Sequence, residues 1–273
     1  RPSNCLDCGA PIAGNYCPHC GQETTAHTLT LRELARDMIG EFVSTDSKFF
    51  RTLRLLLASP GAVTAEYIAG RRERYLMPSR MFIVLSVIFF FVLSLTQVPI
   101  SENVITMSFE KEEIQASFQA SGLSQEMFIE KLDSAFTAAL PIMLLLMVPL
   151  FAGMMRLINL TSHYRFVVHL VFSFHLFSFV AAITVVAFVA LVMIGVVAMA
   201  TAGEGVLEIL AAIGMLALAI YLPIYTTIAL RKVYHYSWLG ALTEAVILLV
   251  VGGVIGLVYL SSFAGFALGF VGE

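Results

Sequence analysis

The chain has 273 residues, of which 59% are hydrophobic and only 13% are charged, with a mean hydropathy of +0.87 and a formal net charge of -3. Soluble globular domains carry about 25% charged residues, so this composition excludes an ordinary soluble domain and predicts a multi-pass membrane protein. The net charge excludes little by itself, because in a membrane protein the information lies in how charges are distributed along the chain.

The first twenty residues contain all four cysteines of the chain, in two Cys-x-x-Cys-Gly motifs: Cys5, Cys8, Cys17 and Cys20. This number and spacing of thiols is typical of a closed, tetrahedral metal site. We therefore predict a zinc ribbon over residues 1–27 that binds one structural Zn²⁺, with iron as the alternative ion and two disulfides as a further alternative. Four sulfur ligands leave no open position for a substrate, so we expect a structural or docking role.

Residues 28–80 are expected to form cytoplasmic or interfacial amphipathic helices. The sequence from Thr30 to Glu33 has the form of a capping box, and apolar residues follow it at helical spacing as far as Phe42. A second helix is predicted from Ser47 to Ala58, with Phe and Leu on one side and basic residues on the other. This pattern is typical of a helix lying in the membrane interface, and packing of both helices on the membrane bundle is the alternative.

A basic stretch follows these helices, with arginines at four positions: Arg71, Arg72, Arg74 and Arg80. Next to a membrane, we expect them to contact anionic lipid headgroups, each contributing about 1 kcal/mol. We do not expect nucleic acid binding, because membrane topology alone accounts for these charges.

Residues 81–273 are predicted to hold five transmembrane helices, which makes the fold class all-α. Each helix is a charge-free apolar stretch long enough to cross about 30 Å of hydrocarbon. Between the first two, residues 99–134 form an acidic loop in which we expect two short external helices. The five stretches are Met81 to Val98, Ala135 to Met155, Phe166 to Ala200, Val206 to Leu230 and Leu242 to Phe270.

The charges that flank these stretches predict the orientation of the chain. Acidic residues dominate residues 99–134 and include the only charge in residues 201–205, whereas the other flanks are basic, and basic flanks lie in the cytoplasm. The N-terminus and the ribbon are then cytoplasmic, and the C-terminus is external. The basic residues concerned are Arg71, Arg72, Arg74, Arg80, Arg156, Arg165, Arg231 and Lys232.

Polar side chains inside the spans form a candidate intramembrane site: His169, His175, Tyr221 and Tyr225. An ionisable residue near the bilayer centre often marks a pathway or a site, and a neutral histidine can also act as a hydrogen bond between helices; both interpretations stay open. The two histidines point about 120° apart on a helix, so they cannot chelate one ion unaided. We expect Tyr221 or Tyr225 to be the partner of His175, and Glu244 to extend toward the interface.

The order of these motifs resembles a widespread, functionally uncharacterised family of bacterial membrane proteins with an N-terminal zinc ribbon. The resemblance implies a bacterial inner-membrane protein with a cytoplasmic ribbon and a periplasmic C-terminus, and it implies no reaction. Phe177 stands where this family often has a further histidine. The matching segments are Tyr16 to Gln22, Arg51 to Leu53, Pro60 to Gly61, Glu66 to Pro78 and His169 to His175, with a weaker match at Arg231 to Tyr234.

No nucleophile–base pair, phosphate-binding loop or open metal site is recognisable in the sequence, so we expect no enzymatic activity. The favoured function is an accessory or scaffolding subunit that docks its ribbon to a membrane partner, either another membrane protein or a second copy of the chain. The alternative is a transporter or lipid-handling protein with a midplane cavity around His175, Tyr221 and Tyr225. An intramembrane enzyme or a haem protein is a third hypothesis.

Overall fold

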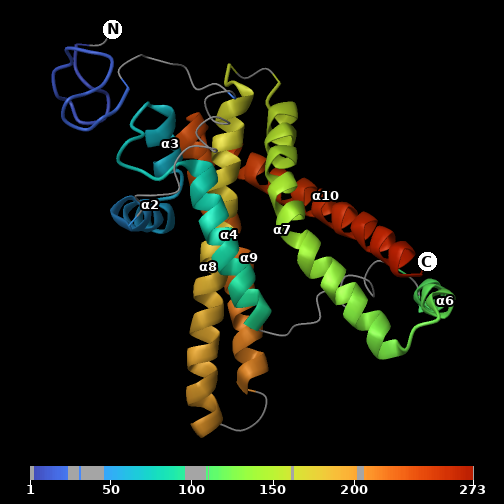
Figure 1. Cartoon of the computed structure of the whole chain (residues 1–273). Helices are drawn as coiled ribbons and strands as arrows, with labels where there is room; N and C mark the ends of the chain where they lie inside the picture. Colours follow the sequence, from blue (N-terminus) through green and yellow to red (C-terminus); the bar gives the residue numbers. More distant parts are fainter. Residues whose placement is uncertain are drawn as a thin grey trace. The chain divides into compact units, whose positions relative to one another are not determined.

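The computed structural model describes residues 3–23, 31, 46–95, 109, 111–160, 163–201 and 206–272. Within these residues the chain forms eight α-helices and no β-strand, which confirms the all-helical class (Figure 1). All but Leu31 of the helix predicted from Thr30 to Phe42 lies outside the described residues. The helices are α2 (Asp46–Ala58), α3 (Ala62–Ile68), α4 (Pro78–Leu95), α6 (Lys111–Ser121), α7 (Gln125–Ile158), α8 (Phe166–Thr201), α9 (Val206–Tyr234) and α10 (Trp238–Gly272).

Five of these helices, α4, α7, α8, α9 and α10, are long and apolar enough to cross a membrane, as predicted. Their most apolar stretches are only 6% to 28% buried inside the protein. Large apolar side chains therefore cover the outside of these helices, as a lipid environment requires. The protein is accordingly a membrane-spanning helical protein.

The external segment differs from the prediction, because only α6 is a separate helix there. Gly122 has φ 63 and ends α6, and the second expected short helix is the first part of α7, which continues without a break into its span. The acidic residues of this part lie on a continuous helix because charge alone does not end one. Pro141 and Pro149 also lie inside α7.

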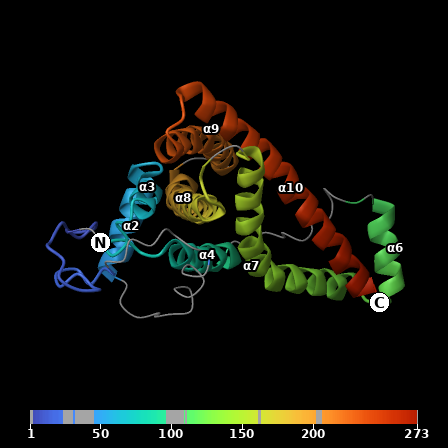
Figure 2. The same ribbon diagram turned by 90° about the horizontal axis from the view of Figure 1, so that it is seen from above.

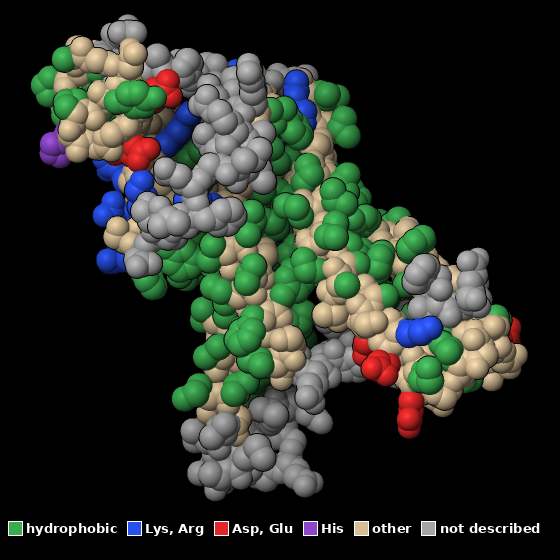
Figure 3. All heavy atoms as spheres, in the orientation of Figure 1, with side chains coloured by type: hydrophobic (Ala, Val, Ile, Leu, Met, Phe, Trp, Pro, Cys, Tyr) green, Lys and Arg blue, Asp and Glu red, His purple; other side chains and the backbone are tan. Residues whose placement is uncertain are grey.

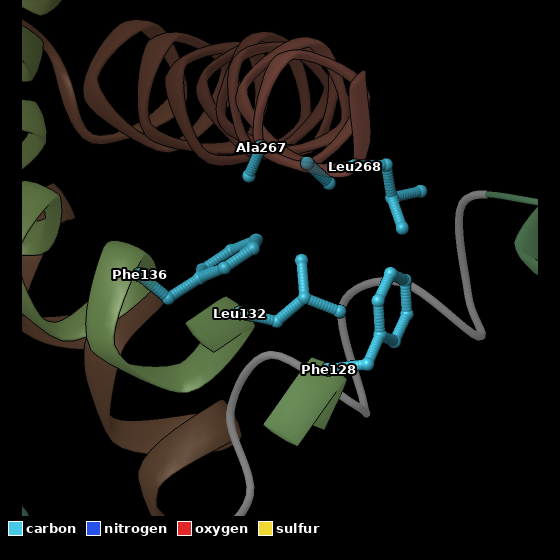
Figure 4. Close-up of a cluster of buried hydrophobic side chains, with 6 residues drawn as sticks. Phe128, Leu132, Phe136, Ala267 and Leu268 are labelled. Carbon is cyan, nitrogen blue, oxygen red and sulfur yellow. The ribbon is translucent and has the colours of Figure 1, made fainter. Parts of the chain in front are cut away.

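Clustering of contacts divides the chain into two compact units, residues 1–89 with 152–246 and residues 90–151 with 247–273. In the second unit, Phe128, Leu132 and Phe136 share one face of α7, since they are four residues apart, and they point toward Ala267 and Leu268 of α10 (Figure 4). This cluster is the apolar core of that unit. The domain boundaries predicted from the sequence remain a prediction.

In the first unit, α8 and α9 run side by side, and α2 and α3 pack against them (Figures 1 and 2). The sequence analysis did not foresee α3. It follows Gly61, whose φ of 72 is in the left-handed region, and a Cβ at Gly61 would lie 2.8 Å from both Cα and O of Ala229 in α9. The absence of a side chain at Gly61 therefore lets the start of α3 contact the backbone of α9.

A single threonine joins α2 to the start of α4. The Thr52 hydroxyl donates to the Lys48 carbonyl at 2.7 Å and accepts from the Leu76 backbone N–H at 2.8 Å. Thr52 is fully buried, so this hydroxyl satisfies two backbone groups that water cannot reach. It fixes the turn that carries the arginines next to α2.

Candidate functional site

The four cysteines converge at the N-terminus and form a candidate metal site. Their Sγ atoms all lie within 4.8 Å of one another, with Cys5 to Cys20 and Cys8 to Cys17 each at 3.5 Å, and none is in a disulfide. A tetrahedral zinc ion with Zn–S bonds of about 2.3 Å places its sulfurs about 3.8 Å apart. The cluster could therefore hold one metal ion with little rearrangement.

The turns of the ribbon prepare the thiols for a cation. The backbone N–H groups of Gly9 and Gly21 donate to the carbonyls of Cys5 and Cys17 at 2.9 Å, and both glycines have positive φ. A hydrogen bond from the Cys20 backbone N–H lowers the pKa of Cys17 to about 6, whereas burial raises the pKa of Cys20 to about 12. A bound cation would stabilise all four thiolates, since metal binding displaces their protons.

The ribbon is attached to the turn between α3 and α4 by side chains from both of its Cys-x-x-Cys motifs. Asp7, in the first motif, is buried and accepts a hydrogen bond from Arg74 Nε at 3.0 Å, while Arg74 Nη2 donates to the Asp7 carbonyl. Gln22, just after the second motif, donates through Nε2 to the Gly70 carbonyl at 2.7 Å. These contacts fix the ribbon against the membrane-proximal segment.

Three of the four arginines predicted to contact lipid headgroups contact the protein instead. Arg74 pairs with Asp7, Arg71 binds both carboxylate oxygens of Glu66, and the Arg72 guanidinium lies 5.5 Å from the Tyr67 ring centre. The hydrogen bonds from Arg71 lower the pKa of Glu66. Figure 3 shows basic side chains gathered beside α2 and α3. Headgroup contact by the half-buried Arg71, Arg72, Arg74 and Arg80 remains a prediction.

His175 is held by α3 rather than by either predicted tyrosine. Its side chain is 2% exposed, and Nδ1 lies 2.9 Å from the Thr64 hydroxyl, with the Tyr67 ring edge-on at 6.4 Å between ring centres. The expectation that Tyr221 or Tyr225 is its partner is wrong. The physical reason is that α3 occupies the space beside this part of α8.

The other residues of the predicted polar site do not join His175 in one cluster. The Tyr225 hydroxyl donates to the Leu56 carbonyl at the end of α2 at 2.8 Å, and Tyr221 is 38% exposed. His169 is fully buried, and its Nδ1 lies 2.9 Å from the hydroxyl of Tyr234 in α9. Each polar group therefore joins a different pair of segments.

A second polar network lies beside His169, and the sequence analysis missed most of it. The Tyr236 hydroxyl donates to Asn159 Oδ1 at 2.6 Å, and Asn159 Nδ2 donates to Glu244 Oε1 at 2.7 Å. Glu244 is buried, so the expectation that it extends toward the interface is wrong. These contacts join the end of α7, the turn after α9 and the start of α10.

Thr64→Val is expected to lower the free energy of unfolding by about 1 to 3 kcal/mol, because it keeps the volume of the side chain and leaves His175 Nδ1 buried without a partner. Thermal unfolding of the full-length protein in a mild detergent measures the effect. Thr184→Val is the matched control, since the Thr184 hydroxyl bonds only within α8, to the Val180 carbonyl. Equal midpoints for the two variants would contradict a role for the Thr64–His175 hydrogen bond.

Comparison with known proteins identifies one similarity. Residues 46–90 match a family described as a protein of unknown function (DUF3667). No curated protein and no solved structure matches the chain. The matched segment contains α2, α3 and most of α4, so it includes Thr64, which contacts His175, and Arg74, which contacts the ribbon. The similarity therefore covers the part of the chain that connects the ribbon to α8 and α9.

Proposed function

We propose that this protein is a non-catalytic membrane subunit whose cytoplasmic zinc ribbon docks a second membrane protein. The observation that carries the proposal is the attachment of the ribbon to the α3–α4 turn by Asp7 and Gln22. A ribbon that is only tethered by a linker samples many orientations, whereas an attached ribbon presents one surface and loses less entropy on binding.

The membrane part supports this proposal because its segments form a connected support for the ribbon. The α3–α4 turn holds the ribbon, Thr64 of α3 bonds His175 of α8, and the Tyr225 hydroxyl of α9 bonds the last turn of α2. In this arrangement the intramembrane polar groups hold the cytoplasmic segment against two spans. That is the role of interhelical hydrogen bonds in packing.

The metal of the ribbon is proposed to be zinc. Four cysteine ligands suit Zn²⁺ and also iron, but only a redox role would call for iron, and no second redox group is recognisable in the described residues. Zinc would supply the folding free energy of a segment too short to bury a core of its own.

A transporter or lipid-handling protein is the second candidate. One observation favours it: within the described residues, Nε2 of both His169 and His175 is buried without a hydrogen-bond partner. Such groups could receive a proton or a polar substrate. The packing role is better supported, because the opposite ring nitrogen of each histidine already bonds a neighbouring helix.

The location proposed for the protein is the bacterial inner membrane, with the N-terminus in the cytoplasm and the C-terminus in the periplasm. The basic flanks of the spans support this orientation.

Photo-crosslinking from the ribbon tests the docking proposal. A photoreactive phenylalanine analogue at Tyr16, which is 65% exposed, is expected to form an adduct with one other membrane protein in intact source membranes. The same analogue at Met127, which is 50% exposed in α7, is the control and is expected not to form that adduct. Absence of any protein adduct from Tyr16, or an identical adduct from Met127, would overturn the proposal.

A further inference from the structure

A surface hollow of about 460 Å³ lies at the end of α9 and is not used by the ribbon or by the histidines. Its walls are Ile228, Arg231, Lys232, His235 and Tyr236, and no acidic side chain of the described residues lines it. Arg231, Lys232 and His235 are exposed, so their nitrogen atoms are accessible from outside. The lining combines an apolar wall with two cations and an imidazole.

The positive charge of the hollow is not cancelled by its surroundings. Lys232 acts electrostatically on Glu66, but the carboxylate of Glu66 already binds Arg71 through both oxygens. The C-terminal end of α9 contributes about half a negative charge, which is less than the two positive charges of Arg231 and Lys232. The hollow therefore stays positive and favours an anion.

Neighbouring rings hold the lining groups in place before any ligand binds. The Arg231 guanidinium lies 4.3 Å from the centre of the Trp238 ring, a cation–π contact that restricts its side chain. Tyr236 forms a fixed wall, because its hydroxyl bonds Asn159. His235, with φ 57, turns the chain between α9 and α10. A site organised in this way loses little entropy when it binds a ligand.

The position of the hollow identifies the kind of anion. It lies where one candidate span, ending at Tyr234, is followed by the next, beginning at Trp238. Trp and Tyr at such span ends are typical of the membrane–water interface, where lipid phosphates lie. Ile228, two turns of helix back from Tyr236, suits the apolar part of a lipid next to its phosphate.

We propose that Arg231, Lys232 and His235 form a binding site for the phosphate group of an anionic glycerophospholipid. A phosphate diester carries the charge and the acceptor oxygens that Arg and Lys recognise. The site is distinct from Arg71, Arg72 and Arg74, which are engaged with the protein. It does not depend on the proposed docking function.

The fluorescence of Trp238 provides a direct test, because Trp238 is the only tryptophan of the chain and stacks with Arg231. Phosphatidylglycerol, phosphatidylcholine and inorganic phosphate are titrated separately into the delipidated full-length protein in a neutral detergent. Phosphatidylglycerol is expected to change the emission saturably, and the other two compounds are expected to have little effect. Lys232→Gln, which keeps the Arg231–Trp238 contact, is expected to weaken phosphatidylglycerol binding about tenfold.

Arg54→Gln is the matched control, because it removes one exposed charge from α2 and is expected to bind phosphatidylglycerol as the unmodified protein does. Thermal unfolding checks that both variants are folded. Mass spectrometry of the phosphatidylglycerol that remains bound gives a second measurement, which is independent of the fluorophore. Equal responses to both lipids, saturation by inorganic phosphate, or unchanged binding by a folded Lys232→Gln variant would overturn the proposal.

Discussion

Purified full-length protein is expected to contain one zinc ion per chain, and Cys17→Ser is expected to remove it. The four sulfurs form a closed ligand set, so three thiols leave the ion exposed to water and weakly bound. Structural zinc binding contributes about 10 to 16 kcal/mol in small metal domains, so its loss is expected to unfold residues 3–23. Elemental analysis measures the metal, and limited proteolysis measures the folding of the ribbon.

His19→Ala is the control for this experiment, because His19 lies inside the second motif and is exposed. It is expected to keep the full zinc content and the resistance to protease. Protein without zinc or iron, or with a disulfide between Cys5 and Cys8, would refute the metal site, whereas iron in place of zinc would refute only the identity of the ion.

Gly61→Ala is expected to be the most destabilising of the small substitutions, lowering the free energy of unfolding by about 3 kcal/mol. Two effects add. Alanine is strained at the φ of 72 that Gly61 adopts, and its Cβ would lie 2.8 Å from backbone atoms of Ala229, which cannot rotate away as a side chain does. The start of α3 must then move away from α9, which disturbs the Thr64–His175 hydrogen bond as well.

Thermal unfolding in detergent measures this loss, with Gly214→Ala as the control. Gly214 lies in α9, like Ala229, and a Cβ there would have no atom within 4 Å. Its variant is expected to unfold at the same temperature as the unmodified protein or slightly above it, since alanine favours a helix. A Gly61→Ala variant that is as stable as the Gly214→Ala variant would contradict the close contact between α3 and α9.

The features predicted correctly from the sequence are those encoded by local patterns. A span requires about twenty apolar residues in a row, so all five could be located, although α7 extends further than its apolar part. The cysteines share a site because two short motifs only eight residues apart bring four thiols together. The helix from Asp46 to Ala58 followed from its amphipathic spacing and from the Pro60–Gly61 stop.

The contacts that the sequence could not supply join residues far apart in the chain. Thr64 and His175 are separated by 111 positions, and Asp7 and Arg74 by 67. No spacing rule links such residues. The seven-residue α3 is also too short for a periodic signal, so the depth of His175 in its span indicated the wrong partners. Buried Glu244 was misjudged because Asn159 and Tyr236 come from other segments.

Charge reversal at the Asp7–Arg74 contact tests most directly whether attachment of the ribbon is needed for docking. The readout is the Tyr16 photo-crosslink in intact membranes, compared among Asp7→Arg, Arg74→Asp and the double variant. Each single variant places like charges together and is expected to lose the adduct, while the double variant restores an ion pair and is expected to recover it. Zinc content is expected to stay constant in all three. An adduct that persists in both single variants with the ribbon folded would contradict the proposed attachment.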